Sequence, residues 1–207
     1  MAVLDGFLGR HEPIAFVIGR QEGCAGFMTG ANGKLRRPEG VCFVTRGPGG
    51  TNASIGVHTA AQDSTPMVLF VGQIARGHRD REAFQEVDYR AVFGPLAKWA
   101  AEVDQVERLP EYISRAFHVA RSGRPGPVVL ALPEDMLSSF ADVPDLPAPM
   151  AAVAGVTEAQ VATVALAIRG AERPLVVVGG PAWSAQAAEE LEAFAESWGL
   201  PVAVSFR

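Results

Sequence analysis

Six short apolar runs, rich in β-branched residues, most strongly limit what this chain can fold into. They occupy residues 14–18, 41–45, 67–71, 128–132, 175–178 and 202–205. Each run is almost continuously apolar rather than alternating, which is typical of parallel strands that are covered on both faces. Helical patterns lie between them, at residues 22–31, 51–61, 109–122, 157–170 and 184–198, and Thr157 with Gln160 predicts a capping box at the start of the fourth. This alternation predicts an α/β fold with a doubly wound parallel sheet.

A proline-rich segment at residues 141–156 divides the chain. It has no periodic apolar face and is typical of a semi-rigid linker between domains. We therefore expect a first domain over residues 1–140 and the beginning of a second, Rossmann-like α/β domain over residues 157–207. Residues 3–8 have helical spacing without a preceding cap, and the last apolar run reaches the end of the chain. We expect the chain to be a piece of a longer protein.

Charge and cysteine content exclude several classes of function. The 207 residues carry 18 Lys and Arg against 23 Asp and Glu, and no basic run exceeds the pair Arg36 and Arg37. We therefore expect no nucleic-acid partner. The apolar runs are far shorter than the roughly 20 residues that span a membrane. Cys24 and Cys42 lack C-x-x-C spacing, which excludes a structural zinc site and favours the reducing cytoplasm. The four histidines are scattered, so no metal ligands are predicted.

A glycine-rich turn at residues 47–52 follows one strand and opens a helix, as a dinucleotide-binding motif does. Its last position is Asn52 rather than glycine, and Gln73 follows the next strand where that motif places an acidic residue. NAD binding is therefore not predicted.

Three segments are expected where ligands bind in open parallel sheets, just beyond the carboxyl ends of strands. They are Glu22 at a helix start, the segment of residues 45–52 that contains the glycine turn, and the polar loop of residues 83–88. Taken singly, each has an ordinary structural explanation. A first-turn carboxylate favours the helix dipole, glycines make tight turns, and acidic loop residues form a solvated face.

Taken together, these segments resemble the N-terminal, pyrimidine-binding domain of thiamine-diphosphate-dependent enzymes of the acetolactate synthase group. The resemblance covers nearly all of residues 1–140, and the chain from about Val156 resembles the opening of the family's central domain. The motifs that carry it are R-Q-E-G at 20–23, V-C-F-V-T-R-G-P-G-G-T-N at 41–52, Q-D-S-T-P-M at 62–67, A-F-Q-E-V-D at 83–88, A-F-H-V-A at 116–120 and G-R-P-G-P-V at 123–128.

The resemblance implies a role for particular residues. Glu22 matches the glutamate that exchanges a proton with N1′ of the cofactor's aminopyrimidine. The positions that match cofactor-binding residues are Gly47, Pro48, Gly49, Asn52 and Gln85, and those expected on the substrate side are Arg46, Phe84 and Lys98.

Two positions depart from the family's pattern. Gln21 stands where many members have histidine, and Arg46 stands where serine is common. We expect the Arg46 cation to bind a substrate carboxylate.

The resemblance also implies parts that this chain lacks. The family's Mg²⁺ and diphosphate motif, Gly-Asp-Gly followed by Asn, belongs to a third domain and is absent from this sequence. FAD, which some members bind in the central domain, is a candidate second cofactor, with Gly179, Gly180 and Pro181 as a candidate segment. The family builds each site between subunits, so the resemblance implies a homodimer or homotetramer, and an inactive fragment when this chain is alone.

The predicted activity is that of a carboligase acting on a small 2-keto acid. Two alternatives stay open. One is a decarboxylase of the same superfamily, of the benzoylformate or oxalyl-CoA type. The other is a non-catalytic α/β interaction module.

Overall fold

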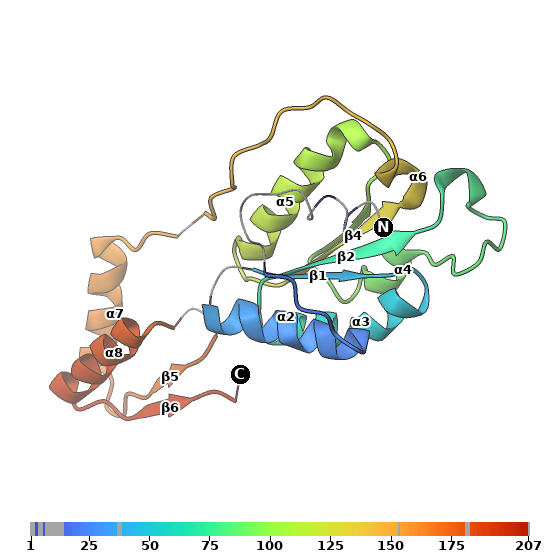
Figure 1. Ribbon diagram of the computed structural model, residues 1–207. Coiled ribbons are helices and arrows are strands. Elements are labelled where there is room, and N and C mark those ends of the chain that lie inside the picture. Colours follow the sequence, from blue (N-terminus) through green and yellow to red (C-terminus); the bar gives the residue numbers. More distant parts are fainter. Residues whose placement is uncertain are drawn as a thin grey trace. The chain divides into compact units, whose positions relative to one another are not determined.

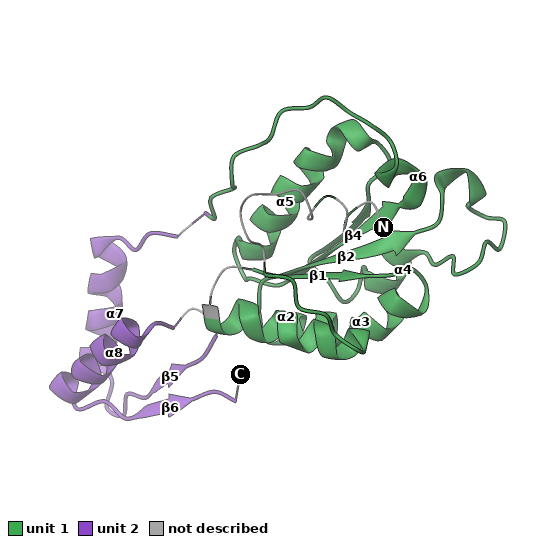
Figure 2. Ribbon diagram, in the orientation of Figure 1, with its two compact units in different colours: residues 1–151 green, residues 152–207 purple. Residues whose placement is uncertain are grey.

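A computed structural model describes residues 15–36, 39–152, 154–180 and 183–206, together with Val3 and Gly6. The chain divides into two compact units, residues 1–151 and residues 152–207 (Figure 2). The residues around the division, from 140 to 152, form neither helix nor strand. The helix predicted near the N-terminus lies almost entirely outside the described residues.

A parallel sheet of four strands forms the centre of the first unit (Figure 1). Its strands are β1 (Gly40–Val44), β2 (Met67–Gln73), β3 (Trp99–Glu102) and β4 (Pro127–Pro133), in the spatial order β1-β2-β4-β3. The register pairs Gly40 with Met67, Met67 with Pro127, and Trp99 with Val128. The carboxyl ends of all four strands therefore lie along one edge of the sheet.

Helices cover both faces of this sheet. Helices α2 (Glu22–Arg36) and α3 (Pro48–Gln62) lie on one face, and α5 (Leu109–Arg121) lies on the other (Figure 1). Short helical segments follow the strands: η1 (Arg76–His78), α4 (Tyr89–Phe93), η2 (Val106–Arg108) and α6 (Glu134–Leu137).

Alternate side chains of the central strands enter two separate cores. In β2, Met67, Leu69 and Val71 pack in the core with α3 and α4, whereas Val68 and Phe70 pack in the core with α5 and α6. This two-sided burial explains why the central strands are apolar at almost every position. The predicted parallel, doubly wound sheet is confirmed, and so are the strands at 41–45, 67–71 and 128–132, with small changes at their ends.

Helices α2 and α3 meet through glycine. A Cβ atom at Gly56 would lie 2.7 Å from the Cα of Gly26, and one at Gly26 would lie 3.1 Å from the Cα of Gly56. Only residues without side chains permit this approach. The contact fixes the spacing of the two helices and so brings the N-terminus of α2 next to the first turns of α3.

The strand expected at residues 14–18 is not formed. Residues 15–19 are neither helix nor strand, and Val17 and Ile18 are 74% and 82% exposed; Ile14 lies outside the described residues. A β-branched run becomes a strand only where a neighbour pairs with it and a layer covers it. In the described part of the chain β1 pairs only with β2, and no strand pairs with residues 15–18, so this run stays outside the sheet.

Sequence patterns missed several short elements, among them β3, α4 and α6. Strand β3 has only four residues, two of them alanine, which has a low strand propensity. Helices α4 and α6 have five and four residues, too few to show a helical period.

The second unit contains α7 (Glu158–Gly170), β5 (Val176–Val178), α8 (Ala185–Trp198) and β6 (Val202–Val204). The predicted capping box is present: the Gln160 amide donates to Thr157 Oγ1 at 3.3 Å, and the Thr157 amide donates to Gln160 Oε1 at 2.9 Å. Gly199 ends α8 in the left-handed conformation, with φ 64°. Strands β5 and β6 pair in parallel, as expected for the start of a second α/β domain.

Candidate functional site

Glu22 is the first residue of α2, at the carboxyl edge of the sheet, and its side chain is half-buried. The amide Nδ2 of Asn52 donates to Glu22 Oε2 at 3.2 Å. A Cβ atom at Gly49 would lie 3.8 Å from the other oxygen, Oε1. The structure therefore brings Glu22, Asn52 and the glycine turn together, as the sequence led us to expect.

The Glu22 carboxylate is not neutralised by a neighbour within the described structure. The ion pairs formed among the described residues join other carboxylates to Lys or Arg, and none of them includes Glu22. One of its oxygens is held by Asn52, while the other lies near Gly49, on the side where Thr45 packs. A carboxylate in this position is available to share a proton with a ligand.

The glycine turn has a conformation that side chains would disturb. Gly47 has φ 60° and ψ −118°, and a Cβ atom there would lie 2.6 Å from the Cβ of Gln85. Pro48 occupies the first turn of α3, where its missing N–H is not needed. At Gly49 a Cβ atom would lie 2.6 Å from Thr45 Cγ2. The turn therefore presents main chain to the space beside Glu22.

Tyr89, which the sequence patterns did not single out, supports this turn through a hydrogen bond. The Gly47 amide donates to the Tyr89 hydroxyl at 2.6 Å. The ring is 2% exposed, and burial raises the pKa of the Tyr89 hydroxyl above its ordinary value of 10.0. The only sequence signal was its position directly after the A-F-Q-E-V-D motif.

The loop before Tyr89 holds three residues other than glycine at positive φ: Asp80 (60°), Glu82 (53°) and Gln85 (66°). The Glu86 carboxylate accepts from the amides of Asp80 at 2.8 Å and Ala83 at 3.1 Å, which closes the loop. Such strain persists only where surrounding contacts impose it, and it concentrates at functional sites.

Phe84 and Arg46, the predicted substrate-side residues next to this site, have different surroundings. Phe84 projects from the loop and is 79% exposed. Arg46 precedes Gly47 and forms an ion pair with Glu134, the first residue of α6. Its charge is therefore compensated by a carboxylate in this structure.

Lys98 does not join the other site residues within this chain. It precedes β3, so it lies at the amino edge of the sheet, opposite Glu22. Its ammonium donates to the carbonyls of Val119 and, at 2.7 Å, Ser122, at the end of α5. The expected substrate-side position is corrected: Lys98 caps a helix, and the residue pattern missed this because it does not show which end of a strand a lysine lies at.

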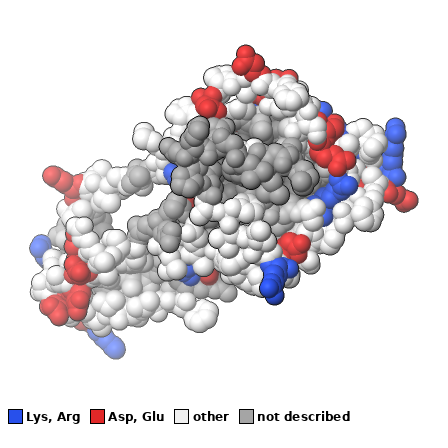
Figure 3. Space-filling view, in the orientation of Figure 1, with Lys and Arg blue, Asp and Glu red and all other residues white. Residues whose placement is uncertain are grey.

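Two further arginines at the carboxyl edge pair with carboxylates. Arg76 contacts Asp135 at 2.8 Å, and Arg79 contacts Asp104 at 2.7 Å and Glu102. Among the residues that the structure describes, no group of three His, Cys, Asp or Glu side chains is arranged to hold a metal ion. In Figure 3 basic side chains are scattered among acidic ones over the described part of the visible face.

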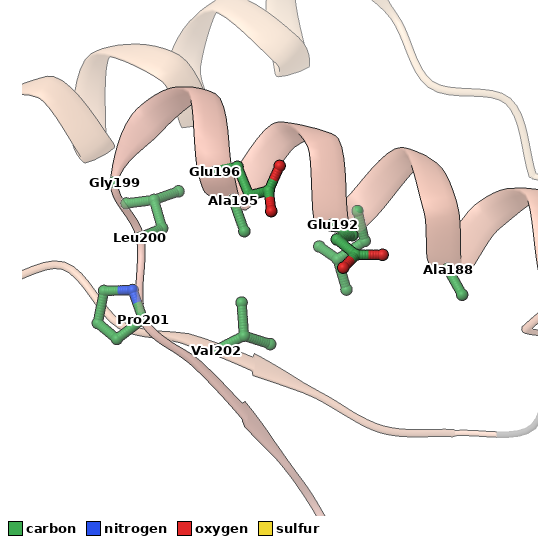
Figure 4. Close-up of a pocket in the computed structure, with 9 residues that line it drawn as sticks. Ala188, Glu192, Ala195, Glu196, Gly199, Leu200, Pro201 and Val202 are labelled. Carbon is green, nitrogen blue, oxygen red and sulfur yellow. The ribbon is translucent and has the colours of Figure 1, made fainter.

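An open hollow lies in the second unit, between α8 and β6 (Figure 4). Its lining is mostly apolar, with the carboxylates of Glu192 and Glu196 on the helix side. The candidate FAD segment does not line it; Gly179 and Gly180 lie elsewhere, and Pro181 falls outside the described residues. None of the described helices is both long and apolar enough to cross a membrane.

Comparisons with known proteins agree with the geometry. Residues 1–92 match the family model described as thiamine pyrophosphate enzyme, N-terminal TPP binding domain, and residues 161–207 match that of the central domain.

Three similar proteins are two acetolactate synthase large subunits and one glyoxylate carboligase. The acetolactate synthase large subunit of Corynebacterium glutamicum is 35% identical over 91% of this chain, and acetolactate synthase isozyme 3 large subunit of Escherichia coli K12 is 34% identical over 99%. Glyoxylate carboligase of Escherichia coli O157:H7 is 34% identical over 93%. The matches span 31%, 37% and 33% of those proteins, so this chain corresponds to about a third of their length. The chain belongs to the thiamine-pyrophosphate-dependent enzymes and is similar to acetolactate synthase large subunits.

Proposed function

We propose that this chain is part of a thiamine-diphosphate-dependent carboligase acting on small 2-keto acids, and that Glu22 exchanges a proton with N1′ of the cofactor's pyrimidine ring. The observation that carries the proposal is the Glu22 carboxylate, oriented by Asn52 beside the bare backbone of Gly49. When bound, the cofactor supplies the carbon nucleophile that adds to a keto group and accepts the electron pair released with carbon dioxide.

The residues present fit a flat, nitrogen-containing ring. A carboxyl group is the side chain suited to exchanging a proton with a weakly basic ring nitrogen. Asn52 donates to Oε2 and so limits the directions in which the carboxyl can turn, which leaves Oε1 for the ligand. Gly49 carries no side chain of its own, and Thr45 Cγ2 fills the place that a Cβ atom would take, so only glycine lets the turn lie this close to Glu22. Gln85 packs against Gly47 and would hold the turn in place.

Arg46 and Phe84 are the proposed substrate-side residues of this chain. Arg46 lies next to the glycine turn, and its partner Glu134 is exposed. A substrate carboxylate would take the place of Glu134, exchanging one ion pair for another at little electrostatic cost. Phe84, exposed on its strained loop, would give the site an apolar wall.

The rest of the site is proposed from the resemblance. We place the Mg²⁺ and diphosphate ligands in a domain outside this chain, and the complete site between two subunits of a homodimer or homotetramer. The chain alone would then be inactive, and the complete enzyme would act as a transferase or lyase. FAD binding in the central domain and a cytoplasmic location are proposed on the same ground, with Cys24 and Cys42 as free thiols in keeping with the latter.

The test uses the full-length protein with thiamine diphosphate, Mg²⁺ and pyruvate. Titration calorimetry is expected to show saturable cofactor binding, and product analysis is expected to show acetolactate. If glyoxylate rather than pyruvate is consumed, the carboligase mechanism stands with a different substrate. Release of free aldehyde as the main product would favour the decarboxylase alternative. Failure to bind the cofactor would contradict the proposal altogether.

A further inference from the structure

A single hydrogen bond joins the glycine turn to a segment 42 residues further along the chain. The amide of Gly47 donates to the hydroxyl of Tyr89 at 2.6 Å, and the bond is buried. Gly47 begins the turn that leads to Gly49, the residue beside Glu22. The position of the turn relative to the sheet therefore depends on a phenol from α4.

The Tyr89 ring has little freedom to move. It is 2% exposed, it stacks on Phe93 with ring centroids 6.0 Å apart, and it belongs to the core on the α3 face of the sheet. Gly50 lies against it, since a Cβ atom at Gly50 would be 2.7 Å from the ring carbon Cε1. A hydroxyl on such a fixed ring is a rigid acceptor, in contrast to one on a mobile surface side chain.

The start of α4 sets where this ring sits. The Asp88 carboxylate accepts from the amides of Arg90 at 3.0 Å and Ala91 at 3.1 Å and so caps the helix that begins with Tyr89. Earlier in the same loop, Gln85 has φ 66°, and its Cβ packs against Gly47. The loop and α4 thus contact Gly47 twice, once through the Gln85 side chain and once through the Tyr89 hydroxyl.

We propose that Tyr89 is a positioning residue for the cofactor site: its hydroxyl holds the Gly47 peptide, and through it the backbone at Gly49 that faces Glu22. The inference rests on the proposed function, because it assigns the turn to cofactor binding. The role assigned to Tyr89 is indirect and requires no contact of its side chain with substrate or cofactor. The residue acts by keeping the turn in one conformation before the ligand arrives, which lowers the entropic cost of binding.

The test is Tyr89→Phe in the full-length protein, with Tyr112→Phe as the matched control. Tyr112 is the only other tyrosine, and it lies on α5, on the opposite face of the sheet. Cofactor affinity is measured by calorimetry with Mg²⁺ present, and folding by thermal unfolding. Because removing the hydroxyl leaves a buried amide without its acceptor, we expect Tyr89→Phe to weaken cofactor binding by about 5- to 30-fold. Tyr112→Phe should change it less than twofold.

Steady-state kinetics separate positioning from general loss of structure. The Tyr89→Phe variant should need more cofactor for half-maximal activity, with a smaller loss of turnover at saturating cofactor, because Glu22 and Asn52 remain. If Tyr89→Phe lowers the melting temperature but binds cofactor as tightly as Tyr112→Phe, the residue is merely structural and the inference is overturned. If the wild type binds no cofactor, the proposed function fails, and the inference fails with it.

A measurement on the wild type covers the case in which the variant does not fold. Amide hydrogen exchange without cofactor should find the Gly47 amide protected, since its partner is a buried hydroxyl. Exchange at Gly47 as fast as at exposed loop residues would contradict the inference.

Discussion

The two edges of the first unit's sheet are built in opposite ways. At the amino edge, charged groups are compensated by the protein itself: Lys98 caps α5, and Glu39, with a side chain 1% exposed, pairs with Arg121. At the carboxyl edge, Glu22 keeps a half-buried carboxylate without a cation, next to a turn with φ 60° at Gly47. Arginines at the carboxyl edge are paired as well, at Arg46, Arg76 and Arg79, so the difference between the edges lies in the Glu22 carboxylate and the glycine turn beside it.

The comparison predicts that amino-edge variants change stability and carboxyl-edge variants change binding. The largest expected effect is at the amino edge. Arg121→Ala leaves Glu39 buried and unpaired, which should lower the free energy of unfolding by about 3–5 kcal/mol. Arg108→Ala, which removes an exposed pair with Glu111, should lower it far less, because solvent screens this pair. Urea denaturation measures both, and equal losses would contradict the contrast between buried and exposed pairs.

Gly47→Ala should affect both stability and cofactor affinity. The alanine would adopt a left-handed conformation and meet Gln85 Cβ at 2.6 Å, so we expect a loss of about 3 kcal/mol from strain and overpacking combined. Gly123 offers a matched control, with φ 61° and open space around it. Gly123→Ala should cost only about 1 kcal/mol and leave cofactor affinity unchanged. Similar losses in the two variants, by denaturation, would show that the turn is not constrained by Gln85.

Alkaline unfolding should report on Tyr89. Burial raises its pKa in the folded state above the ordinary 10.0, so the folded state holds the proton more tightly than the unfolded chain does. The stabilisation is complete below about pH 10 and is lost as the pH rises toward the folded-state pKa, by up to about 1.4 kcal/mol per pH unit. Stability curves from pH 8 to 11 should therefore fall less steeply for Tyr89→Phe than for Tyr112→Phe. Parallel curves would contradict the burial of this hydroxyl.

The smallest expected effects concern Arg46 and Lys98, the two cations that the sequence predicted on the substrate side. Arg46→Ser, at the carboxyl edge, should raise the KM for a 2-keto acid several-fold, because a charged hydrogen bond to the carboxylate is lost. Lys98→Met, at the amino edge, should lower the free energy of unfolding by about 1 kcal/mol through loss of the α5 cap and leave KM unchanged. Steady-state kinetics of the full-length variants test both, and the reverse pattern would restore Lys98 as the substrate-side residue.

The central fold was predictable because both faces of its strands are buried, which leaves a continuous apolar signal at β2 and β4. The capping box at Thr157 and Gln160 was equally local, since its partners lie three residues apart. Residues 15–18 show the limit of such signals, because an apolar run does not reveal whether a neighbouring strand exists to pair with it.

The candidate site, too, was predictable in part. Glu22, Asn52 and the glycine turn were found because motif and topology both place them at one edge. Tyr89 was missed because its contact with Gly47 depends on tertiary packing across 42 residues. The pairing of Arg46 with Glu134 spans 88 residues and was invisible for the same reason.

Exchange of the C2 proton of bound thiamine diphosphate with deuterated water tests the central claim most directly. It is measured by quenched-flow NMR on full-length Glu22→Gln, with Glu158→Gln as control, since Glu158 also opens a helix but lies in the second unit. If Glu22 is the proton-exchanging acid, its variant should exchange about 10²- to 10⁴-fold more slowly while Glu158→Gln matches the wild type. Unchanged exchange in a Glu22→Gln protein that still binds cofactor would contradict the account.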